Sequence, residues 1–137
     1  MSSKVEYVSP ENTPPAQGLY SHVGVAPAGK ILFIAGQLSV NRDGDIVGVG
    51  DFEAQFHQIF ANFKDVLNGM GLGFRHIVKF TTLFTRAEDI DAFMRLRAAA
   101  FPAMFEGTQY PPNTIMVIDR LVKPEFLLEI EAVASTE

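Results

Sequence analysis

Residues 31–38 read Ile-Leu-Phe-Ile-Ala-Gly-Gln-Leu, and their apolar side chains fall on both faces of an extended strand. A run of this kind is typical of a central strand that is covered on both sides. Residues 114–118 show a similar pattern nearer the end of the chain. These two stretches predict a sheet whose two faces are both buried.

Two amphipathic helices are predicted beside this sheet. Over residues 52–67, apolar side chains recur every three or four positions, which marks one face of a helix of about eighteen residues. Asp51 is the expected N-cap, and the glycines that follow the stripe are the expected end. A second helix is expected to begin near Glu88 and to be kinked or ended by Pro102.

The predicted order of elements is β-β-β-α-β-α-β-β, an α+β fold that forms a single domain over residues 1–137. We expect a mixed sheet of five or six strands with both helices on one face. Two helices cover only that face, so the apolar second face predicts a homo-oligomer that packs sheet against sheet. The alternative is a terminal segment that folds over it. The strands are expected at residues 5–8, 20–25, 31–38, 77–84, 114–118 and 127–134.

Composition excludes several function classes. The chain has no Cys, which excludes a thiol nucleophile, disulfides and Cys-ligated metal sites. Its 11 Lys and Arg against 16 Asp and Glu give a net charge of -5, which disfavours binding to nucleic acid or to an anionic membrane. No leader, membrane segment, metal motif or nucleotide motif is visible, so we expect a cytoplasmic protein without metal or cofactor.

Glu129 and Glu131 are two positions apart on the last predicted strand, so both point to the face opposite Leu128 and Ile130. On a solvent face they are ordinary surface charges. In a crevice between subunits one carboxylate would lose water and its pKa would rise, which makes it a candidate general acid or base. The sequence leaves both interpretations open.

Arg97 projects from or beside the apolar stripe of the second helix. A buried guanidinium needs an anion, which is either a structural Asp or Glu or the carboxylate of a ligand. Alternatively, the long side chain extends along the apolar surface and reaches water.

Two further places could bind a ligand. Asn113 and Thr114 begin a strand after a Pro-rich loop, and their polar groups could hold a carboxylate or carbonyl oxygen, although Asn and Thr also serve local roles there. Gly36 lies inside a buried strand, which predicts a bulge or a close approach by a ligand or neighbour.

With these residues the chain resembles the RidA/YjgF/YER057c/UK114 (Rid) superfamily, formerly labelled L-PSP endoribonucleases. The resemblance covers nearly the whole length and implies a chorismate-mutase-like fold, a homotrimer with a central barrel, and ligand clefts between subunits. The segments that carry it include Gly18-Leu19-Tyr20, Ile34-Ala35-Gly36-Gln37, Tyr110-Pro111-Pro112-Asn113-Thr114 and Leu128-Glu129-Ile130-Glu131-Ala132-Val133-Ala134.

The resemblance also implies an activity. Archetypal members hydrolyse reactive enamines and imines, such as 2-aminoacrylate, to 2-keto acids and ammonia without a cofactor. A glutamate on the last strand positions the attacking water, and Glu129 occupies its place. Tyr20 takes the place of the cleft tyrosine, and Thr114 that of the hydroxyl residue of the loop.

The family's carboxylate-binding loop arginine is replaced here by Asn113. Arg97 stands where archetypal members carry an asparagine that also faces the cleft. Our hypothesis is that the two have exchanged places, so that Arg97 binds the carboxylate from the helix and Asn113 orients it from the loop. The alternative is a structural salt bridge between Arg97 and Glu129 or Glu131.

Three functions are possible, and the first two act on or bind a small carboxylate or carbonyl ligand. The first is a cofactor-free deaminase or related hydrolase in which Glu129 assists water attack. The second is a trimer that binds a small metabolite, or regulates a partner, without turnover. The third is RNA cleavage, implied only by the older family label, and the acidic balance counts against it.

Overall fold

The computed structural model describes residues 4–136 of the chain. Its elements follow the predicted order, with one short 3₁₀ turn added before the fourth strand. They are β1 (Glu6–Val8), β2 (Val23–Val25), β3 (Ile31–Gln37), α1 (Phe52–Gly69), the 3₁₀ turn (Phe74–His76), β4 (Ile77–Phe84), α2 (Asp89–Met104), β5 (Asn113–Val117) and β6 (Leu128–Ser135).

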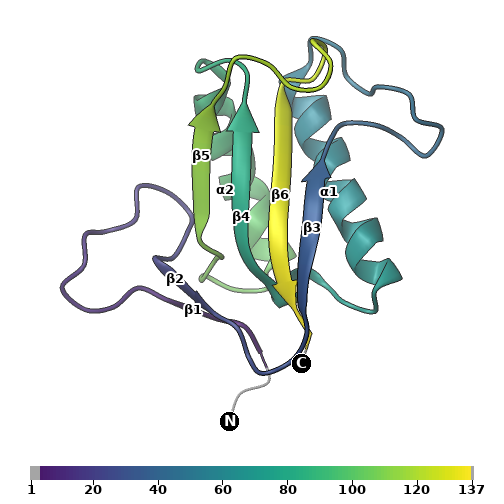
Figure 1. The fold of residues 1–137 in the computed structure, drawn as a ribbon. Helices are drawn as coiled ribbons and strands as arrows, with labels where there is room; N and C mark the ends of the chain where they lie inside the picture. Colours follow the sequence, from purple (N-terminus) through teal and green to yellow (C-terminus); the bar gives the residue numbers. More distant parts are fainter. Residues whose placement is uncertain (1–3, 137) are drawn as a thin grey trace.

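The central sheet is mixed and has the strand order β3-β6-β4-β5. The pair β4 and β5 is parallel, whereas β6 runs antiparallel to both β3 and β4. Both helices lie behind this sheet on one face (Figure 1). The mixed α+β architecture with two helices on one face is therefore confirmed.

The expected sheet of five or six strands was wrong. The central sheet has four strands, and β1 and β2 form a separate antiparallel pair. They are three residues long, and the Tyr7 hydroxyl fastens them to the start of β4 by donating to the Ile77 carbonyl at 2.6 Å. They consequently project beside the sheet instead of extending its ladder (Figure 1).

The helix ends follow the predicted signals with one difference. The Asp51 side chain accepts a hydrogen bond from the Ala54 amide at 3.1 Å, which confirms the N-cap. α2 does not end at Pro102 but continues to Met104. Proline removes only the amide that would bond to the Ala98 carbonyl, and Ala98 is exposed to solvent, so the loss is small in this last turn.

The core between helices and sheet is built mainly from phenylalanine. Phe60 lies at its centre, with ring centroids 4.8 Å from Phe56, 5.7 Å from Phe101 and 6.0 Å from Phe80. The Phe60–Phe80 and Phe60–Phe101 pairs are edge-to-face, and such pairs contribute about 0.5–1.5 kcal/mol beyond their buried area. The packing fixes both helices against the sheet and so fixes the side chains on its other face.

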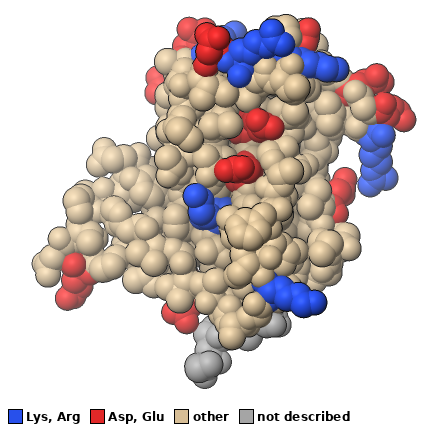
Figure 2. Space-filling model, viewed as in Figure 1, with Lys and Arg blue, Asp and Glu red and all other residues tan. Residues whose placement is uncertain are grey.

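The face opposite the helices is uncovered in the single chain. Phe33 in β3 is 83% exposed, and Ile31 and Met116 are 46% exposed. Figure 2 views this face, which carries acidic and basic groups in the middle of a largely uncharged surface. No segment within residues 4–136 folds over it, contrary to the alternative of a terminal cover. The homotrimer remains a prediction.

Candidate functional site

Glu129 lies on β6, opposite Leu83 of β4, and its side chain extends over Gly36 of β3. A Cβ added to Gly36 would lie 2.5 Å from Oε2 of Glu129 and 2.6 Å from its Cδ. The β3–β6 register shifts here, between Ile34 and Gln37, as in a bulge. The bulge and the close approach predicted at Gly36 are both confirmed, and the approaching neighbour is the candidate catalytic carboxylate.

The surroundings of Glu129 change its acidity. Its side chain is half-buried, and burial raises the pKa of the carboxyl, with the charge of Glu131 raising it further. Leu83 and Met116 on the same face are uncharged, and a second subunit covering the face would remove more water. A carboxylate in such a place takes up and returns a proton more readily than one in open water.

Arg97 on α2 is only 2% exposed, so the interpretation in which it reaches water was wrong. Its guanidinium carbon lies 5.1 Å from the ring centroid of Phe93 and 6.0 Å from that of Phe101. Nη2 donates to the Met94 sulfur at 3.0 Å, and Nε has no hydrogen-bond partner within residues 4–136. Burial lowers the pKa of Arg97 to about 10, while Tyr20 acts in the opposite direction, so the group stays charged at neutral pH.

The alternative salt bridge from Arg97 to Glu129 or Glu131 was also wrong. Neither glutamate forms an ion pair with Arg97 among the described residues. The reason is topological, because α2 packs behind the sheet and both glutamates lie on its open face. Among residues 4–136, the guanidinium therefore has aromatic and sulfur contacts but no carboxylate partner.

The N-terminal loop lies directly against Arg97. A Cβ at Gly18 would collide with Nη2 of Arg97, so only glycine fits there without displacing the guanidinium. Tyr20, two residues on, is half-buried, and its hydroxyl accepts a hydrogen bond from the Gln17 amide at 3.1 Å. A hollow of about 280 Å³ lies beside this loop, and Gly18, Tyr20 and Tyr110 help to line it.

Asn113 and Thr114 begin β5 and point to opposite faces of the sheet. Asn113 Oδ1 accepts a hydrogen bond from the buried Thr82 hydroxyl at 2.9 Å, which places its side chain on the helix side. Thr114 is exposed on the open face opposite Thr81. Because β4 lies between β5 and β6, Thr114 is about 10 Å across the sheet from the strand that carries Glu129.

The predicted site residues thus form two groups within one chain. Glu129, Gly36 and Thr114 belong to the open face, whereas Arg97 and Asn113 belong to the helix side, with Tyr20 in the loop beside Arg97. A single ligand would contact both groups only if the edge of one sheet met the open face of another subunit. Within residues 4–136, no group of three or more His, Cys, Asp or Glu could hold a metal ion.

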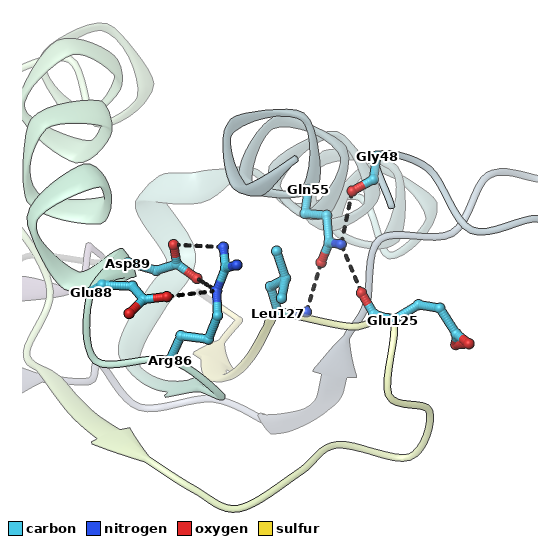
Figure 3. Close-up of polar contacts among 7 residues, drawn as sticks. All are labelled: Gly48, Gln55, Arg86, Glu88, Asp89, Glu125 and Leu127. Atoms are coloured by element: carbon cyan, nitrogen blue, oxygen red, sulfur yellow. Dashed lines mark hydrogen bonds and ion pairs between the residues drawn. The ribbon is translucent and has the colours of Figure 1, made fainter. Parts of the chain in front are cut away.

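Gln55 was not predicted as a functional residue, and its side chain is completely buried at the start of α1. Its amide bonds to the backbone at Gly48, Glu125 and Leu127 (Figure 3). The available signal was its position, because Gln55 falls within the apolar stripe of the helix, four residues before Ile59. A polar residue at such a position is buried and must find partners. Figure 3 also shows Arg86 paired with Asp89, at 2.8 Å, where β4 leads into α2.

Comparison with known proteins identifies the family that shares this architecture. The family model described as Endoribonuclease L-PSP matches residues 10–136. The chain belongs to this family. Among solved structures, the Rid-family protein YyfB from Yersinia pestis has a TM-score of 0.85 and 31% identity, covering 96% of this chain and 98% of that one. Among the helices of residues 4–136, none combines the length and the apolar character that a membrane-spanning segment needs.

Two further relatives have a named substrate or a bound ligand of their own. The 3-aminoacrylate deaminase RutC of Acinetobacter baylyi is 33% identical to this chain, over 94% of it and 96% of the relative. The Escherichia coli protein TdcF, whose crystal structure holds bound serine, has a TM-score of 0.68 and 27% identity over 96% of this chain and 99% of its own. Family membership supports a role related to the deamination of small enamine or imine metabolites.

Proposed function

We propose that this protein is a cofactor-free hydrolase that deaminates small enamines or imines carrying a carboxylate, in clefts between the subunits of a homotrimer. The observation that carries the proposal is the placement of Glu129. Its carboxyl is held over Gly36 on an open, largely uncharged face, and its pKa is raised by burial. The deaminase activity of the RutC relative supports the same reaction class.

In the proposed reaction, the ionised Glu129 accepts a proton from a water molecule while the water oxygen bonds to the imine carbon. Glu129 gives this proton to the nitrogen, and the C=N double bond becomes the single bond of a carbinolamine. Glu129 then takes the proton of the new hydroxyl and passes it to the nitrogen, the C–N bond breaks, and ammonia leaves as the hydroxyl becomes a carbonyl. One imine and one water give one keto acid and one ammonia, and the carboxylate is regenerated.

Arg97 is the proposed partner of the substrate carboxylate. Its guanidinium is charged and buried, and its Nε has no partner among the described residues. Asn113 would orient the carboxylate, while Tyr20 and Thr114 would line the cleft. Because Gly18 packs against Nη2 of Arg97, the loop of residues 18–20 must shift to admit the ligand.

The trimer is part of this proposal because a single chain separates the two groups of residues. The exposed apolar side chains of the open face, with Phe33 at 83% exposure, support an interface there. If the β5 edge of one subunit met the open face of the next, Arg97 and Asn113 of one chain would approach Glu129 of its neighbour.

A metabolite-binding trimer without turnover is the second candidate function. The close packing of Gly18 on Arg97 favours this function, because a guanidinium that is covered by the N-terminal loop would exchange its ligand slowly. Such a protein would gain thermal stability with ligand and form no product. RNA cleavage has only the family description in its favour, and the net charge of -5 opposes it.

The test couples an amino-acid dehydratase, which releases 2-aminoacrylate, to keto-acid detection with and without this protein. The proposal expects keto acid to form faster in proportion to the amount of protein added. Ligand-dependent stabilisation without faster keto-acid formation would support the second candidate instead.

A further inference from the structure

α1 carries side-chain amides that hold the backbone next to both strands of the Glu129–Gly36 contact, where β6 begins and β3 ends. Gln55 is completely buried, and its Nε2 donates to the carbonyls of Gly48 and Glu125, each at 3.0 Å. Its Oε1 accepts a hydrogen bond from the Leu127 amide at 2.9 Å (Figure 3). Both amide protons and the carbonyl oxygen are therefore used, all on backbone groups.

Asn62 makes the corresponding contacts two turns further along the helix. Its Nδ2 lies 2.9 Å from the carbonyls of both Leu38 and Val40, just beyond the end of β3. Gln58 donates to Asn62 Oδ1 at 2.9 Å and so fixes which end of the amide faces the loop. α1 thus anchors the exit of β3 as well as the entry of β6.

Both anchored segments lie at the same end of the antiparallel β3–β6 pair, close to the contact. Leu127 precedes Glu129 by two positions, and Leu38 follows Gly36 by two positions. The Leu127 carbonyl is held as well, by the Thr85 amide at 3.2 Å. The β3–β6 ladder is interrupted by the bulge between Ile34 and Gln37, so regular pairing does not hold the backbone at Gly36, whereas Glu129 stays paired with Leu83 of β4.

We infer that Gln55 and Asn62 are positioning residues, which act through the backbone to keep the Glu129 carboxyl over Gly36. This deepens the proposed function, and its kinetic consequences rest on that function. The amides touch neither the reacting atoms nor the open face, because α1 lies behind the sheet. A displacement of the carboxyl by about 1 Å would lower the turnover rate on the order of a hundredfold.

Gln55→Met tests the inference because methionine has a similar length and no amide. Asn62→Leu does the same at the other anchor. Ile77→Val is the matched control, since it removes one buried carbon near the opposite end of the sheet, where Ile77 pairs with Ala134. In the dehydratase-coupled assay, we expect each amide variant to lower kcat about tenfold to a hundredfold, with KM changed by less than about twofold.

The second readout does not depend on turnover. The pKa of Glu129, measured by NMR of its labelled carboxyl carbon, is expected to fall toward the ordinary value in both amide variants, because a displaced carboxyl gains water. An unchanged Glu129 pKa, or a change no larger than in Ile77→Val, would overturn the inference. If wild-type protein showed no deaminase activity, the proposed function would fail while the titration still decided the positioning role.

Discussion

The carboxylate of Glu129 covers the bare Cα of Gly36, and a methyl group at residue 36 would lie 2.5 Å from Oε2. Real Cβ atoms do not come this close to a neighbouring atom. Two residues far apart in the sequence therefore depend on one another, since the absence of a side chain at one makes room for the carboxyl of the other. This relationship gives the first prediction.

Gly36→Ala is expected to displace the Glu129 carboxyl and lower kcat on the order of tenfold to a hundredfold. The added methyl group should also reduce the free energy of unfolding by about 1–3 kcal/mol through overpacking. Kinetic assays and denaturant unfolding measure the two effects. Gly69→Ala is the control, because nothing lies within 4 Å of a Cβ there. Wild-type kcat in Gly36→Ala would show that the position of the carboxyl does not matter.

Arg97→Met is expected to leave the fold as stable as the wild type or more so. It removes a buried charge that has no carboxylate partner in the described part of the chain, and it keeps an apolar side chain beside Phe93 and Phe101. The same change should raise KM for a carboxylate substrate about tenfold to a hundredfold, the value of a charged hydrogen bond.

Arg95→Met is the matched control for this change. Arg95 is an exposed arginine on the same helix. Its Nη1 lies 3.8 Å from Oε1 of Glu53 on the surface. Thermal melts and steady-state kinetics compare the two variants. A large loss of stability in Arg97→Met with unchanged KM would assign Arg97 a structural role instead.

Glu129→Gln is expected to raise the melting temperature at neutral pH by roughly a few degrees. Because burial raises the pKa of Glu129, the folded chain binds this proton more tightly than the unfolded chain. Stability therefore falls as the pH rises from the ordinary carboxyl value through the raised one. The gain from Gln should be present at about pH 7.5 and absent at about pH 4. Thermal melts across this pH range measure the effect, with Glu6→Gln as the control. A gain in melting temperature that did not depend on pH would contradict the account.

Phe33→Glu is expected to dissociate the oligomer. It places a charge at the most exposed large apolar side chain of the open face, where burial against another subunit would cost several kcal/mol. Light scattering should show a trimer for the wild type and monomers for the variant. Met70→Glu, at the end of α1, is the control, since Met70 is also exposed and lies away from this face. A trimer that survives Phe33→Glu would place the interface elsewhere.

Local sequence patterns predicted most of the fold. The apolar stripe of α1 and its Asp51 cap follow directly from helical periodicity and capping chemistry. The separate β1–β2 pair was not predicted, because the residues of a strand indicate its extended shape but not which strand it will join. The effect of Pro102 on the second helix was not predicted correctly, since the free-energy cost of a proline depends on how close to the end of the helix it falls.

The candidate site was harder to predict for a physical reason. A position beside an apolar stripe is the same in sequence whether Arg97 is buried or extends to water. Only the tertiary packing of Gly18, Phe93 and Phe101 around its guanidinium decides between them. The Gly36 bulge could be anticipated because glycine inside a strand has few explanations. For Gln55, burial could be predicted from its position in the apolar stripe. Its backbone partners could not, because they belong to segments far away in the sequence.

The central claim is that Glu129 carries the chemistry, and Glu129→Gln tests it most directly. The variant keeps the shape of the side chain but cannot accept a proton from water. In the dehydratase-coupled assay, the account predicts a loss of kcat on the order of 10²–10⁴ with unchanged affinity for a non-reactive carboxylate ligand. Keto-acid formation at the wild-type rate by Glu129→Gln would contradict it.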